Sequence, residues 1–252
     1  MRKNKIKELL KNGGTVLNGW LHIPNSWTAE VMAHAGWDSV TVDMQHGLMG
    51  IETAIQMMQA ISTSDAVPMA RVTWNDPGQI MRLLDGGAYG IICPMINSAA
   101  DCQSFISACK YPPEGIRSFG PTRARVYGGM DYADHANEEI MTFAMIETKE
   151  SMNNIEQILS VTGLDAVFVG SGDLKLSLTG KAGHATTSPL FDQAVEKILS
   201  LCTTHEIIPG IWCATIEEAK EMSAMGFRFI AVKSDSMMLT ESAKQVVNGL
   251  KD

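Results

Sequence analysis

The sequence predicts one (β/α)8 barrel of the TIM type, an α/β fold that forms a single domain over residues 1–252. Eight short β-compatible stretches alternate with helical patterns, and no break in composition divides them. The length of 252 residues is typical of one such barrel. Reactive side chains also recur directly after the predicted strands, where such a barrel carries its active site. A doubly wound open sheet is the alternative for the same alternation.

The first half of the chain supplies four strands and the helices around them. The predicted strands are Thr15–His22, Ser39–Asp43, Ala66–Arg71 and Ile91–Pro94. The predicted helices are Lys5–Lys11, Trp27–Ala35, Ile51–Ile61, Pro77–Gly86 and Ala99–Cys109. Two of these helix starts are supported by Asn25 and Asp76, because such side chains cap backbone N–H groups.

The second half repeats the pattern after an interruption. A long loop rich in glycine and proline is predicted at Tyr111–Ala136, and such loops are usually functional. Its arginines are expected to be solvated or to meet an acidic substrate; they are Arg117, Arg123 and Arg125. The last four strands are Thr142–Ile146, Ala166–Val169, Ile207–Ile211 and Phe229–Lys233. The helices are Met152–Leu159, Phe191–Cys202, Ile216–Met225 and Met237–Leu250, with a polar loop at Thr179–Thr187.

Composition narrows the class of protein. Apolar residues make up 45% of the chain but aromatics only 6%, so we expect an aliphatic core with methionine as filler. The net charge of −8 disfavours nucleic-acid binding, because no basic stripe is present. No apolar run approaches the roughly 20 residues of a membrane span. Five cysteines without a C-x-x-C pair favour reduced thiols. We therefore expect a cytoplasmic protein without nucleic-acid or membrane partners.

Two carboxylates end two consecutive strands of the second half. Glu147 follows one predicted strand directly, and Asp173 follows the next through Gly170-Ser171-Gly172. Their separation of 26 positions (173 − 147) is about one βα unit, and neighbouring strand ends lie side by side in a parallel barrel. We therefore expect the pair to share a divalent cation through oxygen ligands. Either acid alone would more often belong to a helix N-terminus.

Further reactive side chains stand at the other strand ends. They are Trp20, His22, Asp43, His46, Arg71, Cys93, Trp212, Cys213 and Lys233. His46 is either a proton shuttle or a structural histidine hydrogen-bonded to Asp43. Arg71 requires an anion and matches a carboxylate with two hydrogen bonds. Lys233 is interpreted as an ion-pair partner rather than as a Schiff-base nucleophile. Asp85, near a helix end, is structural or reaches a neighbouring subunit's site.

Five segments carry a family resemblance. They are Asp43-Met44-Gln45-His46-Gly47, Arg71 with Trp74-Asn75-Asp76-Pro77, Tyr111-Pro112-Pro113-Glu114-Gly115-Ile116-Arg117, Ile146-Glu147-Thr148 and Gly170-Ser171-Gly172-Asp173-Leu174. In this order they resemble the motifs of the 4-hydroxy-2-oxoheptanedioate aldolase family, over nearly the whole chain. Those enzymes are class II, metal-dependent pyruvate aldolases of the phosphoenolpyruvate/pyruvate barrel superfamily, together with the 2-keto-3-deoxy sugar-acid aldolases. Five ordered motifs make the likeness specific.

The resemblance implies a role for each matching residue. Glu147 and Asp173 would bind Mg²⁺, Mn²⁺ or Co²⁺, and Arg71 would hold the pyruvyl oxygens. His46 would be the acid/base residue, oriented by Asp43 or Asp85. Contacts to the substrate are also expected from other residues at the strand ends, namely Trp20, Gly172, Asp173 and Trp212.

The resemblance also implies an assembly and shows two departures. Such enzymes form hexamers that exchange the C-terminal helix, so we expect a homo-oligomer in which Met237–Leu250 packs on a neighbour. Many members have Glu where this chain has Gln45, and Gln where it has Met145. Loss of both polar groups alters the surroundings of the metal and therefore metal preference or rate.

The expected reaction is the reversible cleavage of a 4-hydroxy-2-oxo acid into pyruvate and an aldehyde through a metal-stabilised pyruvate enolate. One alternative is a Schiff-base aldolase that uses Lys233. Another is a lyase of the same superfamily that acts on acyl-CoA or citramalyl-type substrates. A third, suggested by Gln45 and Met145, is a catalytically weak barrel that binds pyruvate or oxaloacetate.

Overall fold

The chain folds into a closed barrel of eight parallel strands, as the sequence predicts. The computed structural model describes residues 1–181 and 188–251. The strands follow one another in sequence order, and β8 pairs with β1 to close the barrel. They are β1 (Val16–Leu21), β2 (Ser39–Asp43), β3 (Val67–Arg71), β4 (Gly90–Cys93), β5 (Met141–Ile146), β6 (Ala166–Val169), β7 (Ile208–Cys213) and β8 (Phe229–Val232). The open-sheet alternative is therefore wrong.

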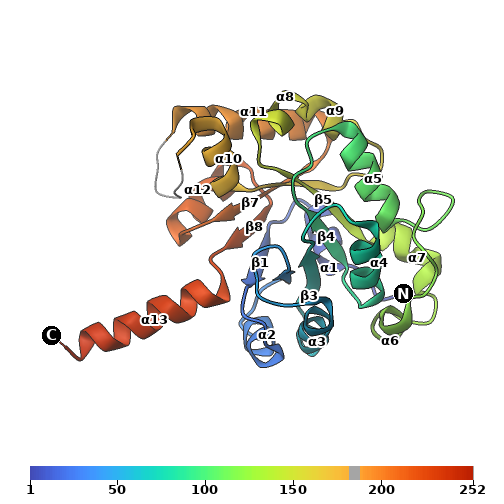
Figure 1. Cartoon of the computed structure of the whole chain (residues 1–252), viewed down its shortest axis with the longest axis horizontal. Helices are drawn as coiled ribbons and strands as arrows, with labels where there is room; N and C mark the ends of the chain where they lie inside the picture. The colour runs from blue at the N-terminus through green and yellow to red at the C-terminus, as the bar shows by residue number, and fades with distance from the viewer. Residues whose placement is uncertain (182–187, 252) are drawn as a thin grey trace.

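Helices surround the barrel on its outside (Figure 1). They are α2 (Ser26–Ala33), α3 (Ile51–Ile61), α4 (Pro77–Asp85), α5 (Ala99–Cys109), α8 (Lys149–Asn153), α9 (Ile155–Leu159), α11 (Pro189–His205) and α12 (Ile216–Met225). Helix α1 (Lys5–Lys11) instead lies at the amino ends of the strands, where Lys7 pairs with Asp165 just before β6 and Leu10 accepts from Arg228 just before β8. The predicted caps are present, because Asn25 accepts the backbone N–H of Trp27 and Asp76 accepts that of Gln79. None of the described helices is both long and apolar enough to cross a membrane.

The strand register brings the carboxyl ends of neighbouring strands to the same face of the barrel. Leu21 pairs with Val42, Asp43 with Arg71 and Ile146 with Val169, so the residues that follow these pairs meet at the same face. Beneath them, the barrel interior contains aromatic rings as well as the expected aliphatic chains. The rings of Trp20 and Phe168 are stacked with centroids 5.4 Å apart. The barrel is thus a packed core that supports a site at its carboxyl face.

Two helices lie where the sequence predicted a loop, and a third lies where it predicted no element. The predicted loop at Tyr111–Ala136 contains α6 (Thr122–Gly128) and most of α7 (Tyr132–Glu139), so that prediction was wrong. Its proline and glycine residues stand at the helix ends, where Pro121 precedes α6 and Gly129 follows it with φ of 112°. Helix α10 (Ser171–Thr179) starts directly after β6. The predicted polar loop at Thr179–Thr187 falls mostly on residues 182–187, outside the described residues.

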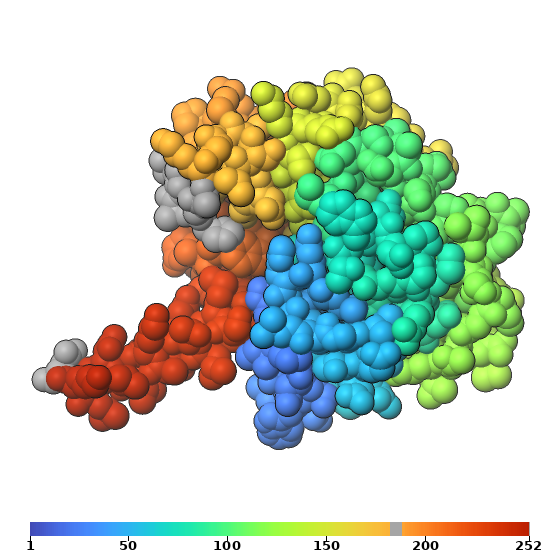
Figure 2. Space-filling view, in the orientation of Figure 1, coloured from blue at the N-terminus to red at the C-terminus, as the bar shows by residue number. Residues whose placement is uncertain are grey.

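The last helix, α13 (Asp235–Gly249), projects away from the barrel (Figures 1 and 2). Its first turn is anchored, since Asp235 is buried. Farther along, four large apolar side chains are exposed, namely Leu239, Val246, Val247 and Leu250. The exchange of this helix between subunits stays a prediction.

Candidate active site

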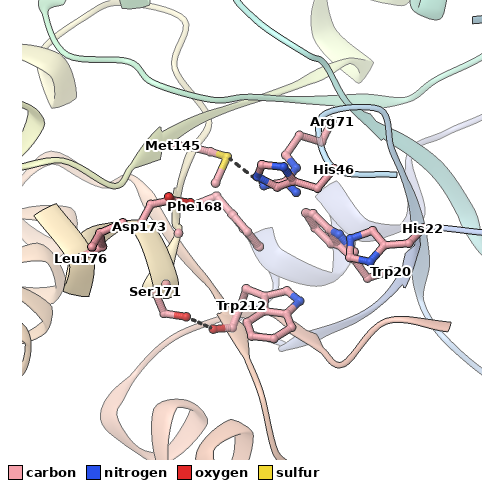
Figure 3. A pocket seen from close by; sticks show the side chains of 12 residues that line it. Trp20, His22, His46, Arg71, Met145, Phe168, Ser171, Asp173, Leu176 and Trp212 are labelled. Atoms are coloured by element: carbon pink, nitrogen blue, oxygen red, sulfur yellow. Dashed lines mark hydrogen bonds between the residues drawn. The ribbon is translucent and has the colours of Figure 1, made fainter. Parts of the chain in front are cut away.

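A cavity of about 340 Å³ opens at the carboxyl ends of the strands. Six residues that the sequence predicted for the site line it: Trp20, His46, Arg71, Gly172, Asp173 and Trp212. Figure 3 shows His46 and Arg71 on the side of the cavity opposite Asp173. Residues from five different strands therefore converge on one space, as the barrel fold requires of an active site.

Asp43, the last residue of β2, is a fully buried carboxylate that accepts six hydrogen bonds. Arg71 donates two of them, from Nε to Oδ1 at 2.7 Å and from Nη2 to Oδ2 at 2.5 Å. Oδ2 also accepts from Trp20 Nε1 at 3.1 Å and pairs with His22 Nε2 at 2.8 Å. Burial alone would raise the pKa of Asp43, but the hydrogen bonds from His22 and Arg71 hold it well below its usual range.

Arg71 is consequently fixed inside the cavity. The sequence predicted that its charge needs an anion, and Asp43 supplies one through a two-bond fork. The guanidinium carbon lies 5.0 Å from the ring centroid of Trp20, and Nη1 lies 3.9 Å from the sulfur of Met145. A guanidinium held in this way is a preorganised positive charge, which does not need to reorient when an anion forms beside it.

Glu147, just past the end of β5, is a buried carboxylate with an incomplete set of partners. Its Oε1 accepts a hydrogen bond from the backbone N–H of Met95 at 2.7 Å. Met95 itself has a positive φ of 56°. Oε2 of Glu147 is buried without a hydrogen-bond partner among the described residues. Burial raises the pKa of Glu147 to about 7, and the charge of Asp173 adds to the increase. Gly170 is required beside it, since a Cβ there would stand 2.5 Å from Oε2.

Asp173 belongs to the first turn of α10 and lines the cavity. The charge of Asp173 contributes to the raised pKa of Glu147, and the two residues follow β5 and β6, which pair in parallel. That they share one cation stays a prediction. The pair fits a divalent cation, because a buried carboxylate oxygen without a partner is costly and hard cations take such oxygens as ligands. Over residues 1–181 and 188–251, no larger cluster of His, Cys, Asp or Glu gathers. One or two carboxylates are typical of Mg²⁺ sites, whose other ligands are water and substrate.

The structure corrects the predicted surroundings of His46. Its exposed side chain lines the cavity, but only its backbone N–H, at 3.4 Å, reaches Asp43. The imidazole bound to Asp43 is that of His22. Asp85 does not line the cavity within this chain, because its carboxylate accepts a 2.7 Å hydrogen bond from Arg117. Neither aspartate therefore orients the His46 ring within one subunit.

The loop arginines and Lys233 lie away from the cavity. Arg117 is almost fully buried between tyrosine rings rather than solvated, so this prediction was wrong. Arg123 donates to the carbonyl of Gly86. Lys233 forms an ion pair with Glu241 of α13, as the sequence predicted. A lysine that is engaged in an ion pair outside the cavity lining is poorly placed to form a Schiff base with a substrate in the cavity.

Several residues of the cavity were not assigned a role from the sequence. They are His22, Met145, Phe168, Gly170, Ser171 and Leu176. The hydroxyl of Ser171 donates to the carbonyl of Trp212 at 2.9 Å and so joins the ends of β6 and β7. The pairing of Leu21 with Val42 brings the next residues, His22 and Asp43, together. The β1–β2 register is therefore the information from which the contact between His22 and Asp43 could have been predicted.

The fold and the site together define a (β/α)8 barrel that carries a cavity at its carboxyl face, lined by the fixed cation Arg71 and by Asp173. The chain belongs to the HpcH/HpaI aldolase/citrate lyase family, whose model matches residues 18–242. It is 40% identical over 251 residues to a hydroxypyruvate/pyruvate aldolase of Rhizorhabdus wittichii, with 97% of each chain covered. It is 36% identical over 245 residues to a 4-hydroxy-2-oxo-heptane-1,7-dioate aldolase of Salmonella dublin, covering 96% of this chain and 92% of the relative.

A solved structure supports the same assignment. The crystal structure of an HpcH/HpaI aldolase/citrate lyase family protein from Burkholderia cenocepacia J2315 superposes with a TM-score of 0.93. The two sequences are 25% identical, and the match covers 99% of this chain and all of the other. The family resemblance carried by the five motifs is therefore confirmed.

Proposed function

We propose that this protein is a metal-dependent class II aldolase that reversibly cleaves a 4-hydroxy-2-oxo acid into pyruvate and an aldehyde. The observation that carries the proposal is a cavity lined by both Arg71, which Asp43 fixes, and Asp173, with the incompletely paired Glu147 buried just past the end of the neighbouring strand β5. The names of the aldolase relatives support the same reaction type.

Glu147 and Asp173 would hold the divalent ion, Mg²⁺, Mn²⁺ or Co²⁺. When bound, such an ion supplies Lewis acidity at the 2-oxo oxygen and a chelating site for the substrate carboxylate. Arg71 then lies beside the same oxygen and stabilises the negative charge that grows there during cleavage. Loss of one such preorganised donor typically costs about 10²–10³ in kcat. Trp20, Gly172 and Trp212 would form the walls against which the substrate packs.

His46 would remove the proton of the C4 hydroxyl. The C4–O electrons then form the aldehyde carbonyl, the C3–C4 bond breaks, and its electron pair moves into the enolate of pyruvate. Carbon 3 takes up a proton to give the methyl group of pyruvate. His46 suits the first of these steps because its side chain is exposed, lines the cavity and belongs to the residue type that most often transfers protons near neutral pH.

The exposed apolar side chains of α13 support a homo-oligomer. A helix that leaves its own barrel and exposes Leu239, Val246 and Leu250 gains stability when it packs on another subunit. We propose a hexamer with exchanged C-terminal helices, in which Asp85 reaches a neighbouring cavity. Light scattering of the full chain and of a Leu239→Glu, Val246→Glu variant tests this: a monomeric wild type would contradict it. Five free buried thiols are compatible with a cytoplasmic location.

The decisive experiment is a screen of aldehydes with pyruvate, run with Mg²⁺ or Mn²⁺ and with EDTA. We expect aldol products only with metal. A parallel screen with hydroxypyruvate in place of pyruvate tests whether this second 2-oxo acid, which appears in one relative's name, also adds to the aldehyde. Borohydride trapping of pyruvate in EDTA would point instead to Lys233, and turnover only with CoA thioesters would point to the acyl-CoA lyase alternative.

A further inference from the structure

The cavity contains a second imidazole, that of His22, for which the reaction described above has no role. His22 follows β1, lines the cavity and is 29% exposed at its side chain. Figure 3 shows it beside Trp20, two positions earlier on the same face of the strand. Because histidine is the usual proton carrier near neutral pH, its presence in an active-site cavity calls for a functional explanation.

Asp43 fixes the tautomer and the orientation of this ring. Its Oδ2 lies 2.8 Å from His22 Nε2, and the low pKa of Asp43 keeps that oxygen an acceptor. Nε2 must therefore be the nitrogen that carries the proton. The other nitrogen, Nδ1, has no hydrogen-bond partner among the described residues and is available as a base. An aspartate bonded to one imidazole nitrogen while the other works as a base is a recurrent catalytic arrangement.

The backbone of His22 is held as well. Asp235, at the start of α13, accepts the N–H of His22 at 2.8 Å and that of Ile23 at 3.1 Å. Asp235 is buried, and its two carboxylate oxygens form these two bonds. The ring and the main chain of His22 are thus both restrained, whereas the His46 ring forms no hydrogen bond within the described part of the chain.

The position of His22 relative to Arg71 selects the carbon it can serve. His22 Nε2 and Arg71 Nη2 share one oxygen, Oδ2 of Asp43, so the imidazole lies next to the guanidinium that faces the enolate oxygen. In the proposed substrate, carbon 3 is bonded directly to the carbon that bears that oxygen, whereas C4 lies one bond farther from it. His22 is therefore placed for C3, and the more exposed His46 for the C4 hydroxyl.

We propose that His22 is a second catalytic residue, which delivers a proton from Nδ1 to C3 of the pyruvate enolate and removes it in the reverse direction. In cleavage, His22 begins the step with a proton on both ring nitrogens: the C2–C3 double bond of the enolate supplies the electron pair of the new C–H bond, the carbonyl at C2 re-forms, and His22 is left neutral with its proton on Nε2. Solvent then returns a proton to Nδ1 and takes the one that His46 removed from the C4 hydroxyl. In condensation, neutral Nδ1 takes a proton from C3 of pyruvate, and the electron pair of that C–H bond forms the C2–C3 double bond of the enolate. This inference rests on the proposed aldolase function and divides its two proton transfers between two histidines.

Deuterium exchange at C3 of pyruvate isolates the His22 step, because it needs no aldehyde. Exchange would be followed by ¹H NMR in D₂O with Mg²⁺, and aldehyde release from 4-hydroxy-2-oxopentanoate would be followed in single turnovers. The test variant is His22→Gln, whose amide nitrogen can still donate to Asp43 but cannot carry a proton. His46→Gln is the reciprocal variant, and His34→Gln, exposed on α2's C-terminal side, is the control.

We expect His22→Gln to slow exchange about 100-fold or more and aldehyde release by less than about fivefold, with pyruvate affinity unchanged. His46→Gln should show the opposite split, and His34→Gln should match the wild type. Exchange at the wild-type rate in His22→Gln, or an equal loss of exchange and aldehyde release, would overturn the role proposed for His22. Either result would leave the proposed aldolase function standing. A wild type that neither exchanges nor releases aldehyde would overturn the aldolase function itself.

Discussion

Two buried carboxylates of the candidate active site, Asp43 and Glu147, differ in how many hydrogen bonds the protein gives them. Asp43 is 0% exposed and accepts six hydrogen bonds, two of them from one guanidinium. Glu147 is 1% exposed and accepts one, from the backbone of Met95, while its second oxygen has no partner among the described residues. Both lie at strand ends of the same face, so the difference arises from their neighbours and not from their depth.

Because of this difference, Asp43 orients neighbouring side chains, whereas Glu147 has a carboxylate oxygen that can bind a ligand. The pKa of Asp43 is held well below its usual range because its hydrogen bonds outweigh burial, so it is a permanent anion that fixes Arg71 and His22. The pKa of Glu147 is raised to about 7 because burial dominates there. A buried carboxylate in that condition gains more from a cation than any satisfied one can.

Removal of the Asp43 charge should have the largest effect. Asp43→Asn leaves the Arg71 guanidinium buried without its counter-charge and frees His22, so we expect kcat/KM to fall by about 10³ or more. Loss of one partner of a buried ion pair should also lower the free energy of unfolding by about 3–5 kcal/mol. Steady-state kinetics and urea denaturation measure both. Asp65→Asn, at an exposed ion pair, is the control, and a comparable loss there would remove the special status of Asp43.

A change of Arg71 that keeps the positive charge should have the next largest effect. Arg71→Lys cannot form the two-bond fork to Asp43, so the cation is no longer fixed beside the enolate oxygen. We expect kcat to fall by about 10²–10³, with a smaller loss of stability than in Asp43→Asn. A lysine variant with near-normal kcat would show that charge alone, without fixed geometry, suffices.

Glu147→Gln should make the metal-free protein more stable at pH 8. The pKa of Glu147 is raised to about 7 in the folded state, above its ordinary unfolded value, so folding holds its proton more tightly. The stability that this proton contributes is therefore present below the unfolded pKa of 4.5 and is lost as the pH rises from there through about 7. We expect a gain of roughly 1–3 kcal/mol at pH 8 that shrinks as the pH is lowered to about 5. Chemical denaturation at both pH values gives this difference, and a variant less stable at pH 8 would count against it.

The affinity for a divalent cation should depend on pH for the same reason. A cation displaces the proton of Glu147, so binding weakens wherever that carboxyl is protonated in the folded protein. Below pH 7 we expect the Kd for Mn²⁺ to rise about tenfold per pH unit. Titrations in matched buffers between pH 5.5 and 8 measure this slope. A flat profile would mean that Glu147 is not a ligand.

The barrel and most site residues could be predicted because each strand carries its own signal. Ser39–Asp43 and Ala166–Val169 are short buried runs that end in polar residues, and the structure has strands with these same bounds. The position of Glu147 just past β5 and of Asp173 in the first turn after β6 followed from the same regularity, since one βα unit separates them. Their joint role as metal ligands stays a prediction. Such local patterns need no knowledge of which side chains touch.

What could not be predicted depends on contacts between strands. The pairing of His22 with Asp43 requires the β1–β2 register, and the missing partner of Glu147 requires the position of Met95. Arg117 was expected to be solvated because its loop reads as polar, yet the fold encloses it with Asp85 and Tyr132. The sequence did not predict helix α10, because Gly172 near its start weakens the helical pattern.

Calorimetric titration of Mn²⁺ at pH 8 into the metal-free wild type, Glu147→Gln and Asp43→Asn tests the division between these two carboxylates most directly. Glu147→Gln should lose affinity by about 100-fold or more, while Asp43→Asn, though inactive, should bind within about threefold of the wild type. If Glu147→Gln binds the ion as tightly as the wild type does, the unpartnered oxygen is not the metal ligand and the proposed mechanism fails.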